Sequence, residues 1–143
     1  MSSNEQPTKT NYLRRILGAI LCLLPLEAAV ASLIVGLFGQ QRPFFPDWHI
    51  VASEITAIAI ALFNLYLSLI RPWIHQLIHR SREGYRYISG APMVGNILVV
   101  VGVVAGFGSI GIALLAIVAT ILNTGDSLWF LIWTWKDKSL WDR

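Results

Sequence analysis

Four long apolar runs, separated by short polar or charged stretches, set the pattern of this chain. The apolar runs lie at about 16–38, 50–70, 92–107 and 112–135, and they predict membrane spans at about 13–38, 50–70, 89–107 and 110–135. An α-helix rises about 1.5 Å per residue, so a run of about 20 residues spans the roughly 30 Å hydrocarbon core of a bilayer. The pattern predicts an all-α membrane protein, a four-helix transmembrane bundle, in a single transmembrane domain over residues 12–143. The polar residues 1–11 predict a disordered cytoplasmic tail.

The start of the first run also has features of a signal peptide. Arg14-Arg15 precedes it, and Ala29-Val30-Ala31 imitates a small-residue cleavage site. The apolar run continues beyond that site to Phe38, and its length of about 23 residues is enough for a full crossing. We therefore interpret it as an uncleaved span.

The segment after the second run has the pattern of a short amphipathic helix. Arg71-Pro72 is expected to end the second span, because proline disrupts a helix interior. At about 72–82, apolar residues recur at 73, 74, 77 and 78, and polar residues lie opposite at 75, 76, 79, 80 and 82. This spacing predicts an interfacial amphipathic helix on the cytoplasmic side.

Two interruptions divide the last third of the chain. Glycines crowd residues 106–111, which favours a tight extracytoplasmic hairpin between the third and fourth spans. The alternative is one helix of about 30 residues, which is long for an ordinary crossing. Asn123-Thr124-Gly125-Asp126 then interrupts the fourth run, and Asp126 is a suitable N-cap for a further helix. The sequence allows a continuous or a broken last span, and we expect a broken one.

Basic residues are distributed asymmetrically around the runs. All but one of the 11 Lys and Arg residues precede the first run, lie between the second and third, or follow the last. Arg42 is the exception and lies between the first and second runs, on the opposite side of the membrane in this arrangement. Because cytoplasmic loops carry an excess of Lys and Arg, both termini are predicted to be cytoplasmic in a multi-pass protein of an inner (plasma) membrane.

Composition agrees with a membrane location and narrows the partners. Hydrophobic residues make up 55% of the chain and charged residues only 13%, which excludes an ordinary soluble domain. The formal net charge of +3 is compatible with nucleic-acid binding, but the bases flank apolar runs, so anionic lipid headgroups are the expected partners and nucleic acid is not. The candidate headgroup-binding residues are Arg71, Arg80, Arg82 and Arg86.

Small residues recur every three or four positions along the runs. On a helix this spacing places them on one face, and such faces let backbones approach closely where lipid provides no hydrophobic drive for association. These faces offer more packing surface than one chain needs, so we expect a homo-oligomer or another protein subunit. The candidate packing residues are Gly18, Ala29, Ser32, Gly36, Ala57, Ala61, Gly102 and Gly106.

Three polar residues within the runs are candidates for function: Glu27, Glu54 and Asn64. An intramembrane charge is costly, so such groups suggest function by default. Glu27 is either a proton- or cation-handling carboxyl or a neutral acid that fixes helix packing, with Asn64 as a plausible hydrogen-bond partner. It lies off the small stripe and is expected to face a later helix or a second subunit. Glu54, near the start of its run, is expected to reach the outer interface.

No sequence motif indicates catalysis. His75 and His79 lie four residues apart, but without a third ligand or an HExxH pattern they favour a titratable interfacial patch over a metal site. The glycines at 106–111 are not followed by the Lys-Ser/Thr of a phosphate-binding loop, and no GxSxG nucleophile elbow is present. We expect no enzyme activity, no metal and no cofactor.

Two short segments carry a resemblance to a class of proteins. Ser89-Gly90-Ala91-Pro92-Met93-Val94-Gly95-Asn96 and Asn123-Thr124-Gly125-Asp126-Ser127-Leu128-Trp129-Phe130 flank the apolar hairpin. Over residues 89–135 the chain resembles small, largely uncharacterised bacterial polytopic inner-membrane proteins, which carry a Ser-x-x-Pro-x-x-Gly entry, an apolar hairpin and a Gly-containing turn before Trp-Phe. Asp126 stands where a second Gly would be commoner. The resemblance implies a bacterial origin, and some proteins of this kind act as immunity proteins against secreted toxins.

Together these patterns predict a non-enzymatic integral inner-membrane protein that acts through protein–protein contacts, as an accessory or toxin-immunity-like subunit. The alternative is a small proton- or cation-coupled transporter or channel subunit that uses Glu27.

Overall fold

The computed structural model describes residues 9–39, 42–80, 92–124 and 127–135, and within them it is all-helical. The all-α prediction is confirmed for this part of the chain. The helices are α1 (Lys9–Phe38), α2 (Trp48–Leu65), α3 (Arg71–His79), α4 (Pro92–Ala105), α5 (Ile110–Leu122) and α6 (Ser127–Thr134), with a π-helical turn at Tyr66–Ile70 between α2 and α3.

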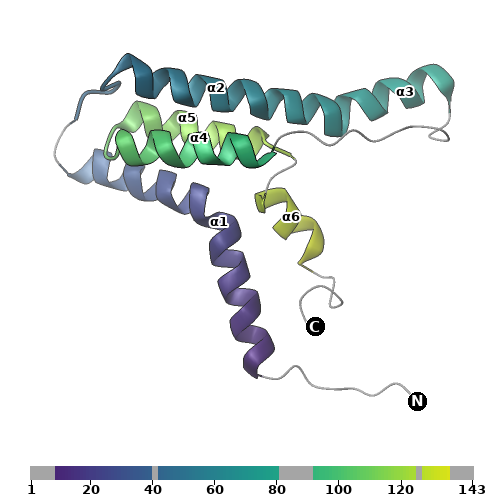
Figure 1. Ribbon diagram of the computed structural model, residues 1–143, viewed down its shortest axis with the longest axis horizontal. Coiled ribbons are helices and arrows are strands. Elements are labelled where there is room, and N and C mark those ends of the chain that lie inside the picture. The colour runs from purple at the N-terminus through teal and green to yellow at the C-terminus, as the bar shows by residue number, and fades with distance from the viewer. Residues whose placement is uncertain (1–8, 40–41, 81–91, 125–126, 136–143) are drawn as a thin grey trace.

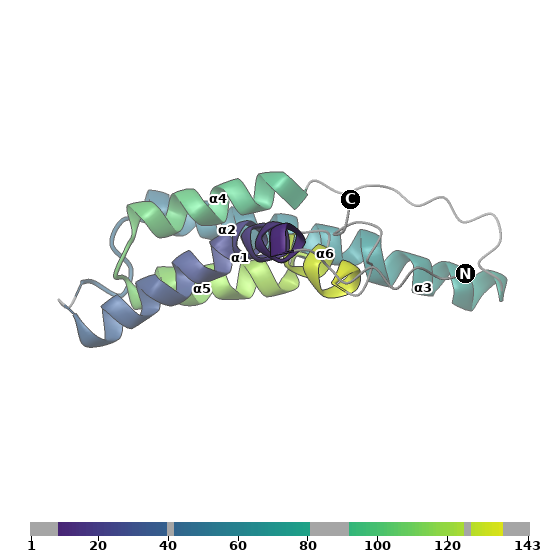
Figure 2. The same ribbon diagram turned by 90° about the horizontal axis from the view of Figure 1, so that it is seen from below.

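Four of these helices pack along a common direction (Figure 1). α4 and α5 lie between α2 on one side and the C-terminal half of α1 on the other, and each of them contacts both α1 and α2. Viewed from below, α4 and α5 flank the other two helices (Figure 2). The C-terminal ends of α1 and α4 and the N-terminal ends of α2 and α5 meet at one end of this group, so successive helices run antiparallel.

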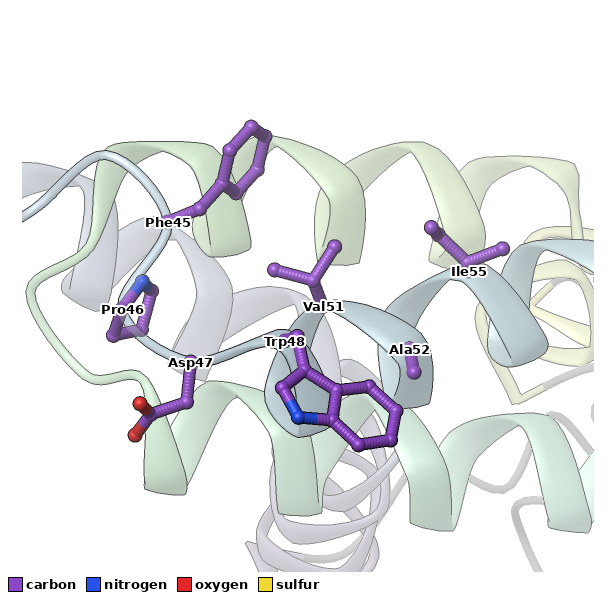
Figure 3. Close-up of a pocket in the computed structure, with 7 residues that line it drawn as sticks. All are labelled: Phe45, Pro46, Asp47, Trp48, Val51, Ala52 and Ile55. Atoms are coloured by element: carbon purple, nitrogen blue, oxygen red, sulfur yellow. The ribbon is translucent and has the colours of Figure 1, made fainter.

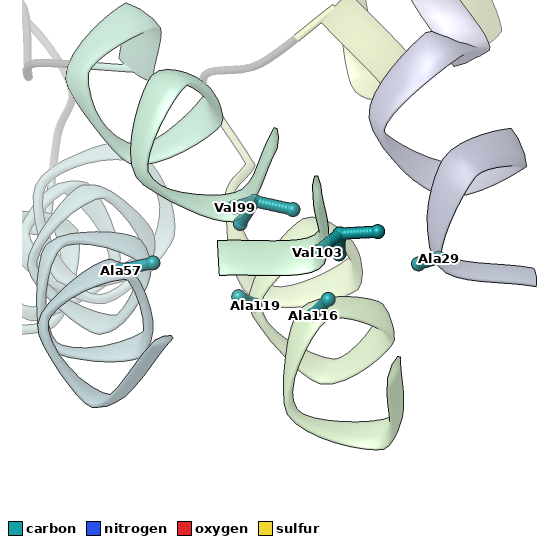
Figure 4. Packing of buried hydrophobic residues seen from close by; sticks show 6 residues of the cluster. All are labelled: Ala29, Ala57, Val99, Val103, Ala116 and Ala119. Carbon is teal, nitrogen blue, oxygen red and sulfur yellow. The ribbon is translucent and has the colours of Figure 1, made fainter. Parts of the chain in front are cut away.

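Small apolar side chains fill the centre of the group (Figure 4). The central cluster is 0–2% exposed and consists of Ala29, Ala57, Val99, Val103, Ala116 and Ala119. It draws on α1, α2, α4 and α5. Because most of these side chains are alanine, the helix axes can approach closely and gain backbone packing in place of bulky side-chain contacts.

α1 is bent about midway along its length (Figure 1). Pro25 lies inside the helix and is buried. Proline lacks the amide hydrogen of the helical ladder and its ring crowds the preceding turn, which is the usual cause of a sharp bend. Next to the bend, the Ser127 hydroxyl of α6 donates a 2.7 Å hydrogen bond to the Cys22 carbonyl, so α6 packs on the N-terminal half of α1.

Two helical stretches are long and apolar enough to cross a membrane, at Arg15–Phe38 and Trp48–His79. α5 and α6 form a pair bent by 46° that makes a third candidate span if the two are counted as one. The helix Met93–Ala105 is apolar but shorter. By length and composition the chain therefore has two or three candidate membrane spans among the described residues, which indicates membrane association.

The helix does not end at Arg71-Pro72, contrary to the sequence prediction. It continues through the π-helical turn into α3, and Pro72 lies in the first turn of α3. The π turn changes the hydrogen-bond register just before the proline, since the Arg71 amide donates to the Tyr66 carbonyl, five residues back. The helix stops instead at Arg80, which adopts a left-handed conformation with φ 51°.

The glycine-rich segment forms a turn, as predicted, and the alternative of one long helix is wrong. α4 ends at Ala105 and α5 begins at Ile110. The fourth run is likewise interrupted, because α5 ends at Leu122 and α6 begins at Ser127. The predicted N-cap Asp126 lies outside the described residues, as do residues 1–8 of the predicted tail 1–11. Residues 9–11 of that predicted tail belong to α1, so the tail prediction is wrong for them.

Candidate functional site

Buried polar groups occur at three levels of the helix group. The first lies at the α4–α5 turn. Gly108, with φ +84°, donates its amide to the Ser32 hydroxyl of α1 at 2.9 Å. A side chain at Gly36 would collide with the Gly108 carbonyl, 2.7 Å from the position of its Cβ. The turn therefore requires small residues on α1 at this level.

Ser109 joins the same turn to the α1–α2 loop. Its hydroxyl donates to the Phe44 carbonyl at 2.6 Å and accepts from the Ile112 amide at 3.5 Å, so it also caps α5. The Gly111 amide donates to the same Phe44 carbonyl at 3.1 Å. These bonds fix the loop before α2 against the start of α5.

Glu54 forms the second level, and it is fully buried. Its side chain is 0% exposed, and neither carboxyl oxygen has a hydrogen-bond partner among the described residues. It packs directly against Gly102 of α4, where an added Cβ would lie 2.8 Å from Glu54 Cδ. The expectation that Glu54 reaches the outer interface is wrong. Its position on α2 turns it towards α4, and the missing side chain of Gly102 leaves the space that it fills.

The third level contains Asn64, which is 1% exposed. Its side-chain amide donates a 2.7 Å hydrogen bond to Asn123 Oδ1 at the end of α5. Gly95 of α4 packs against the same Asn123 side chain, and Thr124 is buried beside it in the sequence, at 3% exposure. Asn64, considered in the sequence as a plausible partner of Glu27, instead bonds to Asn123 at the break between α5 and α6, and it is buried whereas Glu27 is exposed.

Glu27 lies on the outside of the helix group. It is exposed, and no other described helix covers it. Ala31, Ile34 and Phe38 follow it at helical spacing and are exposed as well, with Ile34 at 52% and Phe38 at 86%. We call these four residues the Glu27 face. Of the two expected neighbours of Glu27, a later helix of the same chain is not observed among the described residues.

The predicted packing residues lie mostly inside the group. Gly18, on the N-terminal half of α1, is half-buried. The others are buried, namely Ala29, Ser32, Gly36, Ala57, Ala61, Gly102 and Gly106. Of the basic residues, Arg71 is half-buried and Arg80 is exposed, while Arg82 and Arg86 lie outside the described residues.

His75 and His79 of α3 stack on each other, with ring centroids 4.2 Å apart and planes at 17°. In the described part of the chain no group of three or more His, Cys, Asp or Glu side chains is placed to hold a metal ion. The two imidazole rings therefore stack on each other along α3.

The sequence alone does not identify the structural roles of Ser109 and Asn123. Ser109 precedes an apolar helix, which is an N-cap signal that the glycines around it conceal. Asn123 reads as a helix interruption, and its partner is 59 residues away in the sequence, so no local pattern identifies the pair.

Comparison with known proteins gives no relative: no protein-family model, no curated protein and no solved structure matches this chain.

Proposed function

We propose that this chain is a non-enzymatic, four-span protein of a bacterial inner membrane that acts through protein–protein contacts within the bilayer. The antiparallel order of α1, α2, α4 and α5–α6 agrees with four crossings and with both termini on the cytoplasmic side. In this arrangement α3, which continues from α2 without a break and exposes Trp73, Leu77 and Ile78, lies on the cytoplasmic side of the membrane, where Arg71 and Arg80 meet anionic headgroups.

The position of Glu27 is the observation that carries the proposal. Placing a charged side chain at the centre of a membrane helix costs about 2.5–3.5 kcal/mol on insertion scales. Glu27 lies within the apolar stretch Arg15–Phe38, and its side chain is exposed. A polar group of another protein, or of a second copy of this chain, would remove most of that cost. The Glu27 face is therefore the proposed contact surface.

The packing of the interior argues against the alternative, a proton- or cation-coupled transporter that uses Glu27. Glu54 and Asn64 are ten positions apart on α2, about 15 Å along the helix axis. Between them lies the cluster of buried alanines and valines. The buried hydroxyl of Thr120, on α5 beside this cluster, donates to the Ala116 carbonyl of its own helix at 2.9 Å. Glu27 itself is outside this interior. A chain of polar groups through the core is what a transport path requires, and the described helices lack one.

The kind of partner that we propose rests on the resemblance of residues 89–135 to small bacterial inner-membrane proteins, and not on how the helices pack. An accessory subunit or an immunity-type protein against a secreted toxin has no need of catalysis, and it would act by contacting another membrane protein. The chain's small size and its few polar side chains within the spans suit that role.

Site-specific photo-crosslinking in the native membrane tests the proposal. A photoreactive amino acid replaces Ala31 on the Glu27 face, and the matched control carries it at Val104 on the exposed side of α4, which is 68% exposed. We expect protein adducts from position 31 only, and several-fold less adduct when Glu27→Leu is added. Lipid adducts alone at both positions would contradict the proposal.

A further inference from the structure

A pocket of about 430 Å³ opens where the α1–α2 loop enters α2 (Figure 3). Its volume falls within the usual range of sites for small molecules. Most of the lining is apolar, and the only charged lining residue is Asp47. The seven lining residues are Phe45, Pro46, Asp47, Trp48, Val51, Ala52 and Ile55.

The polar end of the pocket has an unused carboxylate. Asp47 is the N-cap residue of α2, yet its side chain makes no capping hydrogen bond. It forms no ion pair with another described residue either. Asp47 and Trp48 project to the same side of the loop, whereas Phe45 and Val51 project to the other (Figure 3). The carboxylate is therefore available to a group that enters from outside.

The next residue of the loop, Trp48, extends its indole ring on the same side as Asp47 and also lines the pocket (Figure 3). Trp48 is 71% exposed, and the His49 ring lies against it with centroids 3.6 Å apart. Since an indole has two faces, the second remains available. A carboxylate beside an open indole face suits a cation, which pairs with the first and is attracted by the ring quadrupole of the second.

The apolar part of the pocket extends along α2. Ile55 lies seven positions beyond Trp48, about 10 Å further along the helix axis. In a crossing helix, tryptophan favours the membrane–water interface and the next turns face hydrocarbon. The pocket thus has a cation-binding end at interface level and an apolar floor below it, which is the polarity of a lipid in a bilayer.

We propose that this pocket binds a phospholipid with an ammonium headgroup, such as phosphatidylethanolamine, with the ammonium on Asp47 and Trp48 and the upper acyl chain on Val51, Ala52 and Ile55. The charge of Asp47 selects against a purely anionic lipid. The site rests on α2 crossing the membrane and is independent of the partner contact proposed at Glu27.

Native mass spectrometry of the purified full chain tests this assignment, with phosphatidylethanolamine and phosphatidylglycerol of identical acyl chains as probes. For the wild type we expect the first phosphatidylethanolamine to bind about fivefold more tightly than phosphatidylglycerol. Asp47→Asn should abolish this preference, and Trp48→Leu should reduce it. Trp133→Leu replaces a similarly exposed tryptophan on α6, outside the pocket, and should leave the preference unchanged.

Two results would overturn the assignment. One is equal affinity of the wild type for the two lipids, which needs no variant and so cannot arise from misfolding. The other is a preference that survives Asp47→Asn in a protein with unchanged thermal stability. If the pocket instead holds a second copy of the chain, Asp47→Asn would shift the oligomer mass without altering lipid preference, and the lipid assignment would again be wrong.

Discussion

Gly102→Ala is the substitution that most sharply tests the packing of Glu54. A Cβ at this position would lie 2.8 Å from Glu54 Cδ and 3.1 Å from Cγ. Carbon atoms in good contact are about 3.5–4.0 Å apart, so the side chain or one of the two helices must move by roughly 0.5–1 Å. Glu54 is 0% exposed and has little room to move.

The expected cost follows from overpacking. An extra methyl group in a close-packed interior costs about 1–3 kcal/mol, and this exceeds the gain of about 1 kcal/mol from alanine's higher helix propensity over most of that range. We therefore expect Gly102→Ala to lower the free energy of unfolding. In a Glu54→Ala background the new methyl group has space, and the same substitution should be neutral or stabilising.

A double-mutant cycle in bicelles measures this coupling through the free energy of unfolding of the four proteins. We expect a coupling of at least about 1 kcal/mol between positions 54 and 102. Gly95→Ala, on the same helix, is the matched control and should cost the same with and without Glu54. Additive effects at 54 and 102, within about 0.5 kcal/mol, would refute the contact between them.

Three further outcomes are expected from the polar side chains of the helices. Asn64→Leu and Asn123→Leu should show a favourable coupling of about 0.6 kcal/mol, and at most about 1.7 kcal/mol, in a double-mutant cycle, the average and the maximum found for hydrogen bonds between membrane helices. Additive costs would contradict the bond. Ser109→Ala should lower stability by about 1–2 kcal/mol because α5 loses its N-cap and the loop loses its anchor, whereas Thr56→Ala, at an exposed site, should cost under about 0.5 kcal/mol by thermal unfolding. In proteoliposomes, proton flux should equal that of protein-free vesicles under an inward or an outward proton gradient. A proton flux that is present in the wild type and abolished by Glu27→Gln would instead support the transporter alternative.

The sequence predicts the helical content and the order of the helices well. Apolar runs of membrane length admit few structures other than helices, since every backbone group must be satisfied internally. Glycines at 106–111 locate the turn, because three of them occur within six residues of an otherwise apolar run. The small-residue spacing also identifies a helical face, and Ala29, Ser32, Ala57 and Ala61 are all buried in the structure.

Contacts between distant segments could not be derived in the same way. The depth of Glu54 follows from its place in the run, but its burial depends on which helix lies opposite, and that helix is 48 positions away at Gly102. The partner of Asn64 is likewise set by how α5 ends. The continuation past Pro72 depends on a π turn, which no residue type encodes. For Glu54 and Asn64 the missing quantity is the relative rotation of two helices.

Residue-level labelling of the native membrane with a lipid-soluble carbene reagent tests the central claim most directly, because it needs no substitution. Ala31 and Ile34 on the Glu27 face are compared with Val101 of α4. Ile34 and Val101 are similarly exposed in the isolated chain, at 52% and 55%. If Glu27 faces a protein partner, Ala31 and Ile34 are protected and Val101 is labelled strongly. Equal labelling of Ile34 and Val101 would place the Glu27 face against lipid and contradict the proposed contact.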